Sequence, residues 1–238
     1  MAYSFPKNWI YKNKKVMKFK GLVFDFDGTL ANLTIDFEKI KRKILLLAEI
    51  FFEYRVEGLE GYPLLECIEE LTNRLKMKDL DLSKEFNTRC RLILVDMEMR
   101  AARRGSLFPY TKQVLMNLRQ GGIKLGIITR NCTPAVKMVF PDLDDYVDFF
   151  LTREDVPKVK PDPVHVSEAI KRMDVQSEQV LLVGDHPIDI LCAKRAGIKS
   201  GAVASGNSSF EELRASNPDF IETDIRNLYY ILKEQGLI

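Results

Sequence analysis

Two aspartates stand two residues apart after an apolar run, in the segment Asp25-Phe26-Asp27-Gly28-Thr29-Leu30. Like charges held this close in a partly buried site repel each other and need a cation or a proton between them. Magnesium would supply the cation, because hard cations prefer oxygen ligands. Gly28 would let the backbone turn and approach a ligand closely. The alternative is a strand-end turn with capping carboxylates, because Asp and Gly are common turn residues.

Three further polar clusters follow, and each has a structural alternative. Thr129-Arg130-Asn131 follows an apolar run, where a hydroxyl could donate to a phosphate oxygen or cap a helix. Lys160 precedes Pro161 and could project its charge from a stiff turn or simply be solvated. Asp185 and Asp189 supply more carboxylates than one helix cap requires. Together the four clusters offer a nucleophile, a proton donor, a phosphate-binding hydroxyl, a cation and acidic metal ligands, which phosphoryl transfer needs.

The elements that must position these clusters alternate between strands and helices. Short apolar runs bounded by turn residues predict strands, whereas apolar residues at helical spacing, with Pro at the start or Gly after the end, predict helices. The predicted strands are 18–24, 123–128, 180–183 and 201–204, and the predicted helices are 111–120, 163–173, 187–196 and 224–235. Alternation of this kind predicts an α/β fold with a mostly parallel sheet, whose ligands bind at the carboxyl ends of the strands.

The stretch from 32 to 105 has a different pattern, with long helical periodicity and no clear strand. A stripe of Ile40, Ile44, Leu47 and Phe51 predicts a first helix, and two more are expected over 62–77 and 83–100. The sequence therefore predicts an all-helical insertion between the first strand and the rest of an α/β domain.

Composition narrows the class of protein. The chain has 238 residues, and 36 Lys and Arg against 34 Asp and Glu leave a net charge of only +2, so neither nucleic acid nor an anionic membrane is expected as a main partner. The basic residues near the start favour a solvated N-terminal extension over an interaction arm. No apolar run reaches membrane-spanning length and no signal peptide is visible, so a cytoplasmic protein is expected. The four cysteines form no Cys-x-x-Cys pair and are expected to be reduced and mostly buried.

The four clusters resemble the four motifs of the haloacid dehalogenase superfamily of phosphatases, in its phosphoglycolate phosphatase-like branch. These motifs are Asp-x-Asp-Gly-Thr-Leu, a Thr at the second strand end, Lys-Pro, and Gly-Asp-x-x-x-Asp. The resemblance implies a Rossmann-like core formed by residues 1–31 and 106–238, of which 1–17 are the basic extension, and a helical cap formed by 32–105. It also implies Mg²⁺ as cofactor and a small phosphate monoester as substrate.

The resemblance further implies a role for each matching residue. Asp25 is the expected nucleophile, forming an aspartyl-phosphate, and Asp27 the expected general acid and base. The other catalytic residues implied are Thr129, which binds the phosphoryl group, and Lys160, which holds the nucleophile. The metal ligands are Asp25, the main-chain carbonyl of Asp27, and Asp185, with Asp189 orienting Asp185 or Lys160. The substrate-binding residues are Gly28, Thr29, Arg130 and Asn131.

The sequence is compatible with several alternative functions and substrates. A sugar phosphomutase similar to β-phosphoglucomutase keeps both aspartates, and a non-catalytic binding protein on the same fold is a further alternative. Asp27 disfavours dehalogenation, since the dehalogenases of this superfamily lack that acid. A phosphonatase would use a cap lysine, but Lys39, Lys41 and Lys43 fit surface positions on an amphipathic helix better. His186 is expected to pack near a helix start. Phosphoglycolate, a sugar phosphate, a nucleotide and pyrophosphate remain possible substrates, and the oligomeric state is not readable.

Overall fold

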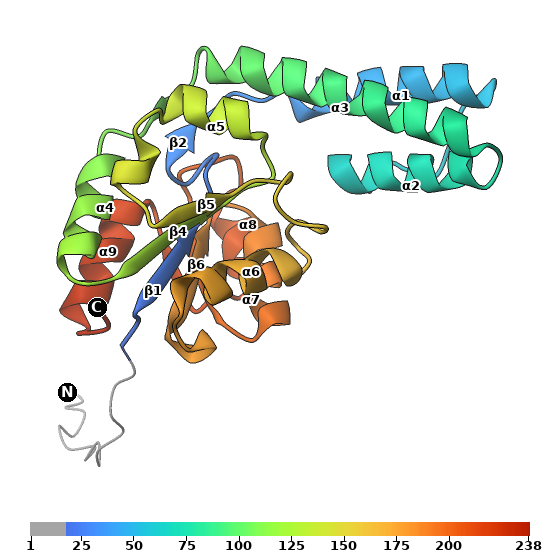
Figure 1. The fold of residues 1–238 in the computed structure, drawn as a ribbon. Helices are drawn as coiled ribbons and strands as arrows, with labels where there is room; N and C mark the ends of the chain where they lie inside the picture. The colour runs from blue at the N-terminus through green and yellow to red at the C-terminus, as the bar shows by residue number, and fades with distance from the viewer. Residues whose placement is uncertain (1–17) are drawn as a thin grey trace, which may run out of the picture.

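A six-stranded sheet forms the centre of the computed structural model, which describes residues 18–238 (Figure 1). The strand order is β5-β4-β1-β6-β7-β8, and every neighbouring pair is parallel. The strands are β1 (Gly21–Phe24), β4 (Lys124–Ile128), β5 (Phe149–Leu151), β6 (Val180–Gly184), β7 (Lys199–Val203) and β8 (Phe220–Glu222). The predicted α/β fold with a parallel, Rossmann-like sheet is confirmed, whereas the predicted basic extension at 1–17 lies outside the described residues.

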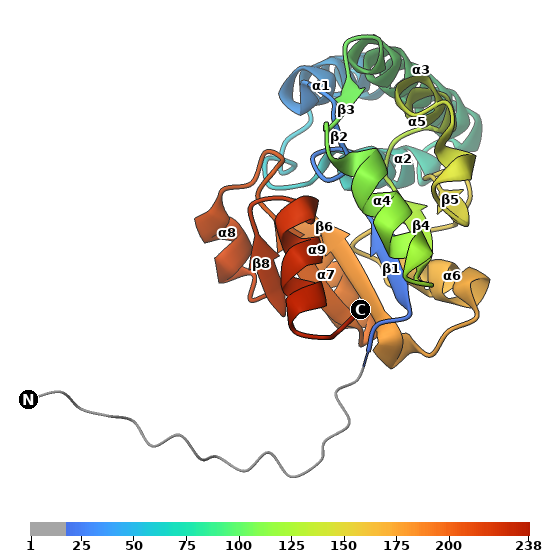
Figure 2. The same cartoon turned by 90° about the vertical axis from the view of Figure 1, so that its left-hand side faces the viewer.

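Helices cover both faces of the sheet (Figure 2). α4 (Thr111–Gln120) and α9 (Ile225–Glu234) pack together on one face, and α6 (Val164–Met173) and α7 (Pro187–Ala196) on the other. Side chains of β1 alternate between two apolar clusters, so Leu22 and Phe24 join the first face and Val23 joins the second. Burial on both faces explains why these strands appear in the sequence as continuous apolar runs.

Three helices form the insertion and lie beyond the end of β1, away from the sheet (Figure 1). They are α1 (Phe37–Phe52), α2 (Leu64–Lys76) and α3 (Leu80–Ala102), hereafter the cap. Two short strands, β2 (Ala31–Asn32) and β3 (Ser106–Leu107), pair antiparallel where the chain enters and leaves the cap. In α1 the buried residues are Ile40, Ile44, Ala48 and Phe52. The predicted helix is confirmed, and Leu47 and Phe51 of its apolar stripe are partly buried and pack against the same cluster.

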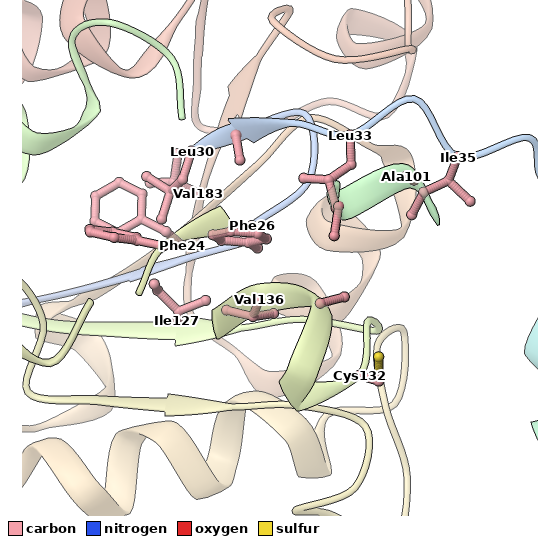
Figure 3. Close-up of a cluster of buried hydrophobic side chains, with 14 of the residues drawn as sticks. Phe24, Phe26, Leu30, Leu33, Ile35, Ala101, Ile127, Cys132, Val136 and Val183 are labelled. Atoms are coloured by element: carbon pink, nitrogen blue, oxygen red, sulfur yellow. The ribbon is translucent and has the colours of Figure 1, made fainter. Parts of the chain in front are cut away.

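One apolar cluster runs continuously from the sheet to the cap strands (Figure 3). Phe26 and Leu30 are fully buried in it, between Phe24 on the sheet side and Leu33 and Ala101 on the cap side. Burial of Phe26 anchors the loop after β1 and thereby restricts the positions of Asp25 and Asp27 on either side of it.

The structure contains elements that the sequence pattern did not predict. These are the three-residue strands β5 and β8, the short helices α5 (Thr133–Val139) and α8 (Phe210–Ala215), and the two-residue strands β2 and β3. Elements this short carry too few residues for a periodic pattern. All four cysteines are free and buried. Within 18–238, no helix combines the length and the apolarity that crossing a bilayer requires.

Candidate active site

Three of the four clusters follow directly on the ends of adjacent strands. Asp25 follows β1, Thr129 follows β4 and Asp185 follows β6, and β1 lies between the other two strands. Lys160 approaches from the loop between β5 and α6. Because parallel strands end at the same edge of the sheet, residues more than 150 positions apart meet in one site.

A buried lysine holds two of the aspartates. The Lys160 ammonium lies 2.8 Å from Oδ1 of Asp25 and 2.6 Å from Oδ1 of Asp189, and its side chain is only 1% exposed. The second oxygen of Asp189 accepts a hydrogen bond from the His186 backbone N–H at 3.1 Å. Both oxygens of Asp189 are therefore engaged in orienting neighbours. Burial alone would lower the pKa of Lys160, but Asp189 and Asp25 raise it above its ordinary value, so the lysine stays charged.

Asp25 and Asp27 have different surroundings despite their proximity. Burial raises the pKa of Asp25 to about 6, with Lys160 opposing the rise. Burial raises the pKa of Asp27 to about 7, and no cation is among the groups that oppose this rise. The Asp27 carboxylate accepts a hydrogen bond from the Leu33 backbone N–H at 2.9 Å, at the entrance to the cap. Of the two, Asp27 is the better proton donor near neutral pH and Asp25 the better anion.

Two glycines leave the space that Asp185 occupies. A Cβ added to Gly28 would lie 2.3 Å from Oδ2 of Asp185, and one added to Gly206 would lie 1.8 Å from the same atom. Gly28 also has φ +80°, which side chains other than that of glycine rarely adopt. The Thr29 hydroxyl donates to Oδ1 of Asp185 at 3.2 Å and is fully buried. The Asp185 side chain is therefore enclosed by Gly28, Thr29 and Gly206.

The acidic residues fit a divalent cation. One oxygen each from Asp25, Asp185 and Asp189 lie within 4.8 Å of one another. Four aspartates, counting Asp27, face the single charge of Lys160, and burial raises the pKa of Asp185 well above its usual range, with Asp25 adding to the rise. Since both oxygens of Asp189 are already hydrogen-bonded, Asp25 and Asp185 are the carboxylates best placed to bind an ion. Oxygen ligands of this kind suit Mg²⁺.

Removing divalent metal is expected to make the folded protein less stable as the pH rises from about 5 to about 8. The pKa values of Asp25 and Asp27 are raised from 3.8 to about 6 and about 7 in the folded state. In this window the folded chain binds more protons than the unfolded chain, so the free energy of unfolding falls with rising pH. We expect the Tm in EDTA to drop by roughly 5 °C or more across this range.

Added magnesium is expected to raise the Tm more at the upper end of that pH range than at the lower end, because it binds the ionised carboxylates. Asp27→Asn removes one titrating group, so the Tm in EDTA should depend less steeply on pH in this variant. A metal-free protein that becomes more stable with rising pH would contradict the assignment of these raised pKa values.

A polar amide without a partner lies beside this acidic group. Asn131 is 5% exposed, and its Nδ2 is the one buried side-chain nitrogen or oxygen in residues 18–238 that makes no hydrogen bond. The Asn131 backbone N–H donates to the Thr129 hydroxyl at 3.2 Å. An unpaired buried donor is costly unless a ligand supplies the acceptor. A phosphoryl oxygen is such an acceptor.

Arg130 lies in the same loop but faces the cap. One of its amino groups forms an ion pair of 2.7 Å with Glu66 in the first turn of α2, and the other donates to the Lys160 carbonyl at 3.1 Å. Arg130 thus links the cap to the loop that carries Lys160, and its charge is already paired.

Sequence reasoning missed several residues of the site. Glu98 on α3 is 3% exposed, accepts from the Cys132 backbone N–H at 3.2 Å and pairs with Arg153 at 2.5 Å. The sequence feature that could have indicated Glu98 is that it is the single acidic residue in a stripe of residues spaced four apart, all of them buried in the structure, namely Phe86, Cys90, Leu94, Glu98 and Ala102. Gly206 lies in a Ser-Gly-Asn-Ser-Ser segment after β7, where small polar residues could have indicated a close backbone approach.

Two other predictions concern residues at the rim of the site. His186 caps α7, its Nδ1 accepting from the Ile188 backbone N–H at 3.1 Å, as expected for a residue at a helix start. Lys39 and Lys43 are exposed, as expected, whereas Lys41 is half-exposed and donates to the carbonyls of Glu60 and Tyr62.

A cleft of about 480 Å³ joins the site to the cap. Its core wall includes Asp25, Asp27, Thr129, Asn131 and Lys160, and its cap wall comes from α1, the loop before α2, the first turn of α2, and α3. This volume suits a small organic ligand. A group bound at Asp25 would have the cap wall opposite it.

Fold and site together define a capped α/β enzyme with an aspartate-rich pocket at the carboxyl edge of its sheet. Residues 22–203 match the family of haloacid dehalogenase-like hydrolases. This chain therefore belongs to the haloacid dehalogenase-like hydrolases. The predicted family is confirmed, and with it the prediction of an enzyme of the phosphatase type.

Individual relatives agree with this assignment. Pyrophosphatase PpaX of Bacillus cereus is 28% identical over 227 residues, which cover 92% of this chain and 99% of the relative. The crystal structure of a haloacid dehalogenase-like hydrolase from Bacteroides fragilis is similar with a TM-score of 0.64 at 27% identity, covering 89% of this chain and all of that one. A predicted phosphoglycolate phosphatase from Haemophilus somnus shares the fold, with a TM-score of 0.62, 21% identity, and coverage of 90% and 97%.

Proposed function

We propose that this chain is a magnesium-dependent phosphatase that hydrolyses a small phosphate monoester through an aspartyl-phosphate on Asp25. The observation that carries the proposal is the difference between two neighbouring carboxyl groups. Asp25 is paired with buried Lys160 and remains the better anion, while Asp27 has a pKa of about 7 and no lysine partner. A nucleophile and a proton donor are the two groups that a two-step phosphoryl transfer requires.

Each residue of the site has its own part in the proposed phosphoryl transfer. An oxygen of Asp25 attacks phosphorus while the bond to the leaving oxygen breaks, and Asp27 donates its proton to that oxygen. Asp27 then takes a proton from water, whose oxygen attacks phosphorus and releases inorganic phosphate and Asp25. Lys160, Thr129 and the free amide of Asn131 bind phosphoryl oxygens. Asp25, the main-chain carbonyl of Asp27, and Asp185 would hold Mg²⁺, which when bound neutralises charge on the phosphoryl group.

Phosphate release from a panel of phosphate esters and anhydrides, with magnesium and with EDTA, tests this function. The panel includes an aryl phosphate, acetyl phosphate, glucose 1-phosphate, phosphoglycolate and, because of the named activity of the Bacillus relative, pyrophosphate. We expect magnesium-dependent release from at least one ester. A sugar phosphomutase would instead convert glucose 1-phosphate into glucose 6-phosphate with little phosphate released. A protein that only binds would release none from any ester.

A further inference from the structure

The cap wall of the cleft is mainly apolar and carries two accessible aromatic rings. Phe37 at the start of α1 is 45% exposed, and Tyr62 in the loop before α2 is 42% exposed. The other apolar lining residues contributed by the cap are Pro63, Leu64, Leu65 and Leu94. Aromatic rings left accessible in a ligand cleft present faces against which a flat or apolar group can pack.

The Tyr62 loop is held in place from α1. The Lys41 ammonium donates to the carbonyls of Glu60 and Tyr62, both at 2.9 Å, so two of its three N–H donors are already used on the backbone. Lys41 therefore fixes the loop that presents the Tyr62 ring, and offers at most one donor to a ligand.

The charges on this wall do not favour a second anionic group. The lining residues of the cap include Glu38, Glu60 and Glu98 against Lys41 alone. Glu98 is balanced by Arg153, and the nearby Arg130 is already paired with Glu66. Within residues 18–238, neither Glu38 nor Glu60 takes part in an ion pair. A phosphoryl or carboxylate group placed here would meet two carboxylates and one committed lysine.

One feature of the cap does attract anions, namely the N-terminus of α2. Its cap residue Pro63 makes no side-chain cap hydrogen bond, so no capping side chain satisfies the first-turn N–H groups. Glu66 lies in that same first turn and already places a carboxylate against the positive end of the helix dipole. The remaining attraction is weak compared with the carboxylates on the same wall.

We infer that the leaving group of the substrate is an uncharged, flat or apolar body packed against Phe37 and Tyr62, and neither a second phosphoryl group nor a short carboxylate. This inference rests on the proposed phosphatase function and specifies its substrate class. It departs from the activity named for the Bacillus relative, which is a pyrophosphatase.

A matched set of esters tests this inference on the full chain with magnesium. Phenyl phosphate and 4-carboxyphenyl phosphate share a ring and differ in one charge, and methyl phosphate lacks the ring. We expect kcat/KM for phenyl phosphate to exceed that for 4-carboxyphenyl phosphate, pyrophosphate and phosphoglycolate by about tenfold or more, mainly through KM. Glu38→Gln and Glu60→Gln should each reduce the difference in kcat/KM between phenyl phosphate and 4-carboxyphenyl phosphate.

Variants of the two rings separate specificity from general damage. Phe37→Ala and Tyr62→Ala are each expected to raise KM for phenyl phosphate about fivefold and to affect methyl phosphate much less, because methyl phosphate has no ring to pack on them. Tyr230→Ala is the control, because it removes an exposed ring on α9 away from the cleft. It should change the kinetics for neither phenyl phosphate nor methyl phosphate. Equal losses on both esters would indicate a structural role for the rings and overturn the inference.

The remaining outcomes distinguish the inference from the function on which it rests. A tenfold preference for pyrophosphate or phosphoglycolate over phenyl phosphate would overturn the inference and leave the phosphatase function intact. Absence of turnover for every compound, including the activated anhydride acetyl phosphate, would contradict the proposed function and the inference together.

Discussion

Asp25→Asn is expected to lower phosphate release by about three orders of magnitude or more, because an amide cannot form the acyl phosphate on which both half-reactions depend. The change is isosteric, and it removes a carboxylate whose pKa burial already raises to about 6. We therefore expect the folded protein to keep its stability, since the charge that is lost was costly to bury. Lys160 retains Asp189 as its partner at 2.6 Å.

Two measurements check this expectation, namely the rate of phosphate release with magnesium and the mass of the protein trapped during turnover. The wild type should gain the mass of one phosphoryl group and the variant should not. Asp81→Asn, at an exposed position on α3, is the matched control and should behave as the wild type. Activity within tenfold of wild type in Asp25→Asn would refute Asp25 as the nucleophile.

Lys160→Met is expected to remove both activity and a large part of the stability. The lysine is one of the largest fully buried side chains, and its ammonium is the common partner of Asp25 and Asp189. Methionine fills much of the same volume but leaves two carboxylates without their cation. Breaking a buried ion pair by removing one partner costs about 3–5 kcal/mol. Because the two carboxylates can take up protons, the deficit in the free energy of unfolding should grow as the pH rises.

Chemical denaturation at two pH values, together with phosphate release, checks this prediction. Lys158→Met, an exposed lysine two residues earlier, is the control and should change neither quantity. The double variant Lys160→Met/Asp189→Asn should recover part of the stability, because one uncompensated charge is gone, but not the activity. If the single variant Lys160→Met were as stable as the wild type, the ion pairs of Lys160 with Asp25 and Asp189 would contribute little to folding stability.

Much of the site could be located from the sequence because its residues directly follow apolar strands. An uninterrupted apolar run predicts a strand buried on both faces, and a parallel sheet brings strand ends to one edge. This pattern predicts Asp25, Thr129 and Asp185 at one edge of the sheet, and the structure has them after β1, β4 and β6. The helical insertion was also readable, since α1, α2 and α3 are long enough to show a period.

Contacts between distant segments could not be read in this way. Thr29 donates to Asp185 across 156 positions, and the Ser205 hydroxyl donates to the Gly28 carbonyl across 177. The spaces left by Gly28 and Gly206 around Asp185 depend on how two loops approach each other. Each of these residues taken alone is an ordinary loop residue, and only its partner gives it a role.

The sequence by itself determined the fold class, the helical insertion and the residues of the candidate site, because local periodicity and strand ends specify them. The tertiary structure decided which charges are paired, which donors are left free and what lines the cleft. It assigned Arg130 to Glu66, left the amide of Asn131 without a partner, and turned Phe37 and Tyr62 toward the site. The physical reason is that burial and charge balance belong to groups of residues brought together by packing, and these determine pKa values and specificity.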